Sequence, residues 1–158
     1  MQKMKSKLIL YSVFLSIVFV TSCSTPKSVV YQRSGKVMCQ KYEEGVIHLV
    51  AEANAESTAK AVAYAERNAI ENLLFKGVPN SNQEKPIIPN ESEAMKKNAA
   101  YFQNLFQNTG YQKFVMQSEV AEKTIEGKTY FVKQKVSVDL NAFRSDLEQN
   151  KVVRKFGL

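Results

Sequence analysis

The chain has 158 residues and a formal net charge of +7, from 22 lysine and arginine residues against 15 aspartate and glutamate residues. Three of the lysines lie within the first seven residues, so the basic and acidic residues of the remaining chain are nearly balanced. No arginine-rich or aromatic-interleaved basic run occurs, and we therefore expect no nucleic-acid partner. The length fits a single domain that is large enough to build an apolar core.

The first 22 residues have the pattern of a secretory signal peptide. Residues 1–7 carry the three lysines, and residues 8–20 form an apolar run that only Tyr11, Ser12 and Ser16 interrupt. This run of about 13 residues is shorter than the roughly 20 apolar residues that a membrane-spanning helix needs. We therefore predict a lipoprotein-type signal peptide at residues 1–22.

The end of this segment resembles the lipobox of bacterial lipoproteins. Val20, Thr21 and Ser22 supply the aliphatic residue and the two small residues that precede Cys23. The resemblance implies lipidation of the Cys23 sulfur, cleavage before this residue and acylation of the new amino terminus. Two or more acyl chains give a stable anchor, so the partner expected here is a membrane. The alternative interpretation is an uncleaved signal anchor in which Cys23 is an ordinary residue.

Three segments follow the signal: a lipidated cysteine with its tether at residues 23–36, a single domain at residues 37–150, and a basic tail at residues 151–158. The residues directly after Cys23 are polar and include a proline, which is typical of a flexible tether. Lipoproteins destined for the cell surface often carry acidic residues just after the lipidated cysteine, and none stands here. The resemblance therefore implies a lipid-anchored outer-membrane protein that faces the periplasm.

The first part of the domain predicts strands followed by a helix. Apolar alternation indicates a strand at residues 45–53, and residues 37–42 are a candidate for a shorter strand before it. Ser57 or Asn54 can cap the next helix, which runs to about Lys76 and ends at Gly77. Small residues on this helix form a ridge that a sheet could approach closely: Ala55, Ala59 and Ala63.

The second part predicts a loop, a helix, a hairpin and a last helix. Residues 78–90 hold three of the four prolines and indicate a loop, and residues 91–108 have helical spacing. Two alternating runs, 110–125 and 128–138, flank the turn at Glu126 and Gly127. A final helix begins after Asp139. The expected fold class is α+β, a small antiparallel sheet with packed helices in the order β-α-α-β-β-α.

Several of these segments resemble the lipoprotein-20 family. They are the strand GVIHLVAEANA, the helix AKAVAYAERNAIENLL, the hairpin FVMQSEVAEKTIEGKTYFVKQKVSVDL and the closing helix, spanning roughly residues 45–147. The N-terminal domain of the flagellar assembly protein T shares the arrangement. The chain departs from the family at residues 54–56, where glycines are common, and in extra residues around 79–89. The resemblance implies helices against a small antiparallel sheet in an envelope-associated protein, and no chemistry.

The sequence gives no signature of an enzyme, so we expect no catalytic residues, no metal site and no cofactor. His48 is the one histidine, it lies inside a predicted strand, and no cysteine or histidine stands at metal-ligand spacing from it. Glu43 and Glu44 are adjacent, and an extended chain would point them to opposite sides. Cys39 has three open interpretations: a half-buried strand residue, an intermolecular disulfide or a reactive thiol.

The remaining candidates are contact surfaces. In the loop, Ile87 and Ile88 are candidate partner-contact residues if they are exposed, and in the tail Phe156 is another. One aromatic group is interpreted as core with its rim, or else as a groove: Tyr101, Phe102, Phe106, Tyr111 and Phe114. The expected function is a non-enzymatic accessory or structural lipoprotein that binds another envelope protein. The alternative is a binding module for a small or lipidic envelope ligand, with its pocket between helices and sheet.

Overall fold

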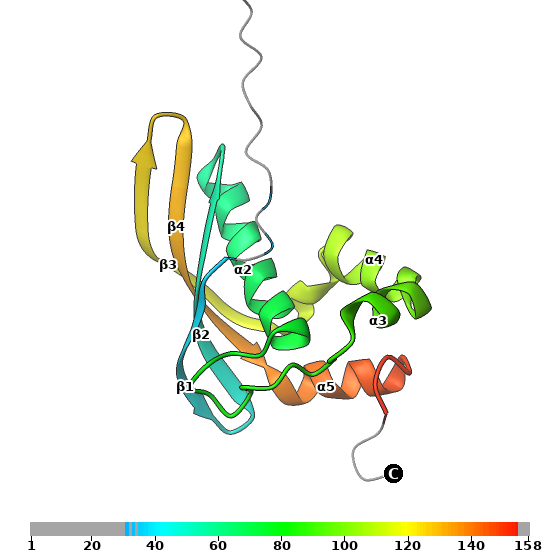
Figure 1. The fold of residues 1–158 in the computed structure, drawn as a ribbon. Helices are drawn as coiled ribbons and strands as arrows, with labels where there is room; N and C mark the ends of the chain where they lie inside the picture. Colours follow the sequence, from blue (N-terminus) through cyan, green and yellow to red (C-terminus); the bar gives the residue numbers. More distant parts are fainter. Residues whose placement is uncertain (1–30, 32, 34, 155–158) are drawn as a thin grey trace, which may run out of the picture.

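The computed structural model describes residues 31, 33 and 35–154, and they form the predicted α+β fold around one antiparallel sheet (Figure 1). Four strands make the sheet in the order β1-β2-β4-β3: β1 Val37–Glu43, β2 Val46–Ala55, β3 Val115–Glu126 and β4 Thr129–Asp139. The helices are α2 Thr58–Phe75, α3 Glu91–Lys97, α4 Ala99–Gln107 and α5 Leu140–Gln149, with a 3-10 helix, η1, at Gly110–Phe114.

The element order differs from the predicted one at three places. The candidate strand before β2 is present as β1, joined to β2 by a tight turn in which Glu44 and Gly45 both have positive φ. The helix expected at residues 91–108 is two helices, because the backbone of Asn98 leaves the helical region and its side chain bonds the Ala94 carbonyl. Residues 110–114, expected as strand, form η1.

The 3-10 turn of η1 has a physical reason in the core. Residues three apart lie on the same side of a 3-10 helix. Tyr111 and Phe114 have this spacing, and both are buried. An extended chain would point two residues at this spacing to opposite sides, so the turn buries both rings while β3 begins directly after it.

Helix α2 covers the inner face of the sheet, and small residues set how closely it packs. Ser57 caps the helix as predicted, its Oγ accepting from the Lys60 amide at 3.3 Å. The predicted ridge of Ala55, Ala59 and Ala63 is wrong, because Ala55 belongs to β2 and Ala59 is exposed. The buried ridge is two residues further along the helix, in phase with the large core residues of the same helix: Ala61, Ala65 and Ala69 with Ile70, Leu73 and Leu74.

Alternation along β4 separates the two faces of the sheet as the sequence predicts. Val132, Val136 and Val138 are buried against α2, whereas Lys133 and Lys135 are exposed on the opposite face. The described helices all lie on the inner side (Figure 1). The outer face of the sheet is therefore available to carry polar and charged groups.

Candidate functional site

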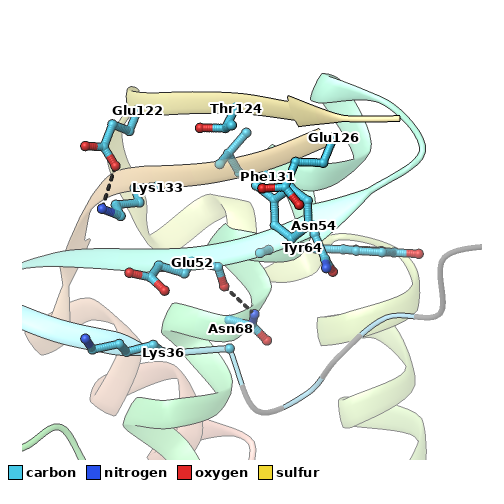
Figure 2. A pocket seen from close by; sticks show the side chains of 13 residues that line it. Lys36, Glu52, Asn54, Tyr64, Asn68, Glu122, Thr124, Glu126, Phe131 and Lys133 are labelled. Carbon is cyan, nitrogen blue, oxygen red and sulfur yellow. Dashed lines mark hydrogen bonds and ion pairs between the residues drawn. The ribbon is translucent and has the colours of Figure 1, made fainter. Parts of the chain in front are cut away.

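The strongest candidate site is a concavity of about 500 Å³ on the outer face of the sheet (Figure 2). Its residues come from the adjacent strands β2, β4 and β3, from the middle of α2 at Tyr64 and Asn68, and from Gly35 and Lys36 just before β1. Glu126, Phe131 and Asn54 gather at one end of the concavity, and Glu122 and Lys133 lie at the other. The full lining is Gly35, Lys36, Glu52, Ala53, Asn54, Tyr64, Asn68, Glu122, Thr124, Glu126, Phe131, Val132 and Lys133.

The register of the strands places these side chains together. Glu122 lies opposite Lys133 in the β3–β4 ladder and forms an ion pair with it at 2.5 Å. Glu52 lies opposite Lys133 on the other side, in the β2–β4 ladder. The hydrogen bond that Lys133 donates to Glu122 raises the pKa of Lys133, and the charges of Glu122 and Glu52 add to the effect. Lys133 is thus held in its charged form between two carboxylates.

One aromatic ring is exposed among these charges. Phe131 retains 37% of its surface in solvent, although it lies inside the ladder opposite Asn54 on β2 and Thr124 on β3. Glu126 lies beside it at the end of the hairpin. A carboxylate next to an open aromatic face attracts cationic side chains, because both the charge and the ring quadrupole favour a cation.

The free edge of β2 forms the floor on one side. The Glu52 amide donates to the Lys36 carbonyl at 2.8 Å, and Asn68 Nδ2 donates to the Glu52 carbonyl at 3.0 Å. Gly35 lies against these groups so closely that a Cβ there would be 1.9 Å from Asn68 Nδ2. The chain therefore passes from α2 to β1 at Gly35. Beyond Ala51 no described strand pairs with β2 on its β1 side, whereas β4 stays paired with β2 as far as Ala55.

The described residues before β1 are fixed to α2. Tyr31 donates to Asn68 Oδ1 at 2.7 Å and to Glu71 Oε2 at 2.9 Å, and its ring stacks under the Arg67 guanidinium at 4.4 Å. Arg33 bonds the same Glu71 carboxylate, which is buried. Burial, followed by the charge of Glu71, raises the pKa of Tyr31. The end of the predicted tether is thus packed onto the domain.

The second notable surface is β3 itself, which is an edge strand of the sheet. All of its twelve residues except Val115 are exposed. Large apolar side chains remain open to solvent, Val120 at 41% and Ile125 at 53%. Within the described part of the chain, no strand pairs with its outer edge. Such an edge is a template for pairing with another chain.

His48 lies at the other end of the outer face. Its Nδ1 lies 2.8 Å from Ser137 Oγ, across the β2–β4 ladder. Ser137 is buried, at 8% exposure, so its oxygen is poorly placed to attack a substrate. Among the described residues, no group of three or more histidine, cysteine, aspartate or glutamate side chains could hold a metal ion.

The loop residues predicted as partner contacts are placed differently from expected. Ile88 is 5% exposed and belongs to the core, so the expectation that it is exposed is wrong. Ile87 is partly buried against the same core. The reason is that the loop returns along α2, where the amides of Ile87 and Ile88 donate to the carbonyls of Leu73 and Leu74. Backbone pairing over such a distance has no local sequence signal.

The other predicted residues divide into two groups. The lipobox residues Val20, Thr21, Ser22 and Cys23, and Phe156 in the tail, lie outside the described residues. In the aromatic group, Phe102, Phe106, Tyr111 and Phe114 are buried, and Tyr101 is partly buried with its hydroxyl on Asp146 at 2.8 Å. The interior between helices and sheet is therefore filled with these rings.

Comparisons with family models, with curated proteins and with solved structures give no match. None of the helices in the described part of the chain is long and apolar enough to span a membrane. Sequence reasoning missed the outer face and the edge of β3, although the run of glutamates and apolar residues along β3 was a visible signal.

Proposed function

We propose that this protein is a non-enzymatic, membrane-anchored lipoprotein of the bacterial cell envelope that binds a protein partner along the edge of β3. The main observation in support of a protein partner is the twelve-residue edge strand β3, which is exposed along its length and has apolar side chains in solvent. The lipobox resemblance at Cys23 supports the anchor, and the lack of acidic residues after Cys23 supports the periplasmic side of the outer membrane.

The packing of Tyr31 gives the anchor a short reach. Cys23 and Tyr31 are eight residues apart, so even a fully extended chain spans at most about 30 Å between them. Since Tyr31 is fixed to α2, this point of the domain stays within that distance of the lipid surface. A partner that meets β3 is therefore itself in the membrane or close to it.

A second candidate function is a binding module for a small envelope ligand, and the concavity beside Phe131 favours it. The site differs from the pocket expected between helices and sheet, because aromatic side chains fill that interior. Three glutamates and two lysines line the concavity, so a ligand there would be polar and bear a positive charge rather than be lipidic.

The anchor and the partner are tested together in native bacterial membranes. The full chain carries a photoreactive residue in place of Gln117 on β3, and a matched version carries it in place of Gln103 on α4, which is also exposed. We expect a discrete cross-linked protein from position 117 and none from position 103. Replacing Cys23 with serine should abolish incorporation of labelled palmitate into the chain and leave the signal peptide uncleaved.

Equal adducts from both positions, or none from position 117, would contradict docking on β3. Incorporation of palmitate by the Cys23→Ser chain, or none by the parent chain, would contradict the lipid anchor.

A further inference from the structure

The outer face of β3 carries acidic side chains beside the edge that no described strand pairs with. Glu119, Glu122 and Glu126 share this face, because the register shift between Val120 and Glu122 keeps the alternation in phase with β4. Glu119 lies opposite Lys135 and Glu122 opposite Lys133, so both lysines are on the β4 side. Glu126 lies opposite the neutral Thr129. A chain that approached from solvent would therefore meet carboxylates first.

The inner side of the same strand carries two exposed apolar residues, Val120 and Ile125, together with the exposed polar residues Ser118 and Lys123. Val120 and Ile125 face the side on which α2 packs, since their ladder partners Gln134 and Tyr130 belong to that side. Helix α2 does not cover them, and both remain largely in solvent. The two sides of β3 are thus complementary to two kinds of side chain in a partner. A partner strand can present both kinds, because its successive side chains point to opposite faces.

A second copy of this chain fits the edge poorly. Two copies of β3 can pair antiparallel about the register shift between Val120 and Glu122, with their outer faces on the same side. In that register, Glu119 of one copy lies opposite Glu122 of the other. Like charges directly opposite one another destabilise a strand pair. The same carboxylates attract lysine and arginine, so the edge discriminates between its own copies and a basic strand.

We infer that the segment paired with the edge of β3 is an extended strand of a partner protein, with alternating basic and apolar residues; this inference rests on the proposed function. Its basic side chains lie over the three glutamates, and its apolar side chains cover Val120 and Ile125. Backbone hydrogen bonds along the edge supply affinity, and the alternating side chains supply specificity. A basic side chain near Glu126 also reaches the concavity, where the Phe131 ring is open.

The probe is a fluorescent ten-residue peptide of alternating lysine and valine, N-methylated on every valine, and binding is followed by anisotropy with the full chain in detergent. Methylation blocks one edge of the peptide, so it cannot stack on itself, and leaves the other edge free to pair. The control peptide has the same residues and charge with every amide methylated. We expect binding of the first peptide at low salt and binding at least tenfold weaker for the control.

The glutamates are tested with two triple variants that remove equal charge. Glu119→Gln, Glu122→Gln and Glu126→Gln should weaken binding of the one-edge peptide at least tenfold. Glu84→Gln, Glu91→Gln and Glu93→Gln, which lie in the loop after α2 and in α3 and away from β3, should leave it within twofold. Circular dichroism establishes that both variants are folded.

Equal loss in both triple variants, or equal binding of both peptides, would overturn the inference, because attraction without strand pairing would then explain the data. Absence of peptide binding would overturn it as well. The photo-cross-link at position 117 would still report on the proposed function, since it requires a partner at β3 and makes no assumption about the partner's sequence.

Discussion

The two faces of the one sheet are built for different tasks. On β2 and β4 the inner face carries valine, leucine and alanine that are buried, whereas on β3 the inner side remains exposed. The outer face carries glutamate and lysine around the exposed Phe131, and no described helix covers it. Because alternation separates the two faces residue by residue, stability is concentrated on one and the other is free to change its side chains. Substitutions on the two faces should therefore have opposite consequences for stability and binding.

The largest effect is expected from a matched pair of phenylalanine substitutions. Phe143 is fully buried and packs on the Phe114 ring at 4.7 Å, so Phe143→Ala should lower the free energy of unfolding by about 4 kcal/mol. Phe131→Ala on the outer face should lower it by about 1 kcal/mol or less, because that ring is partly in solvent. Urea denaturation measures both. Equal losses of unfolding free energy in the two variants would contradict the claim that stability is concentrated on the inner face.

Next comes the buried carboxylate of α2. Glu71 bonds Tyr31, Arg33 and Arg67, and Glu71→Gln removes the charge from these bonds, at a cost of about 2 kcal/mol. Glu91 also pairs with Arg33 but is exposed, so Glu91→Gln should change stability by less than about 0.5 kcal/mol. Thermal and urea unfolding compare the two. A larger loss for Glu91→Gln would contradict the assignment of Glu71 as the fixing group.

Alkaline pH should destabilise the fold through the buried tyrosine Tyr111. Burial, followed by the nearby charge of Glu66, raises the pKa of Tyr111 to about 12. Between pH 10 and 12 the unfolded chain loses this proton while the folded chain keeps it. Stability should therefore fall as pH rises, by up to about 1.4 kcal/mol per pH unit for this group.

Tyr111→Phe should flatten that decline, and the measurement is the urea midpoint at pH 9, 10 and 11. An unchanged slope in the variant would show that Tyr111 is not protected from ionisation in the fold.

The smallest effect concerns Cys39, and it separates a half-buried strand residue from a reactive thiol. Cys39 is half-buried on β1, and burial raises the pKa of its thiol. A raised pKa leaves less thiolate, so alkylation by iodoacetamide at pH 7.5 should be slower than that of the same thiol in urea. Faster alkylation in the folded chain would favour a reactive thiol.

Patterns that depend on neighbouring residues predicted much of this fold. Alternation gave the two faces of β4 correctly at Val132, Lys133, Lys135 and Val136, and Ser57 was a correct helix cap. Each of these features is decided within a few residues, where side-chain period and capping act directly.

Features decided by distant contacts were missed or placed wrongly. Ile88 is buried because its amide pairs with the Leu74 carbonyl, and Gly35 is required because Asn68 and the Glu52 carbonyl lie against it. Neither contact has a signal in the local sequence. The candidate site on the outer face could be anticipated only in part, since the alternation of β3 was visible but its position at the edge of the sheet depends on the strand order.

Amide hydrogen exchange along β3 tests the central claim most directly, measured on the full chain with and without the one-edge peptide. We predict that the amides of β3 that point away from β4 exchange rapidly in the free protein and become protected with peptide, while those of α3 and α4 are unchanged. Protection of helices α3 and α4, or no change along β3, would contradict the account of this edge as the docking site.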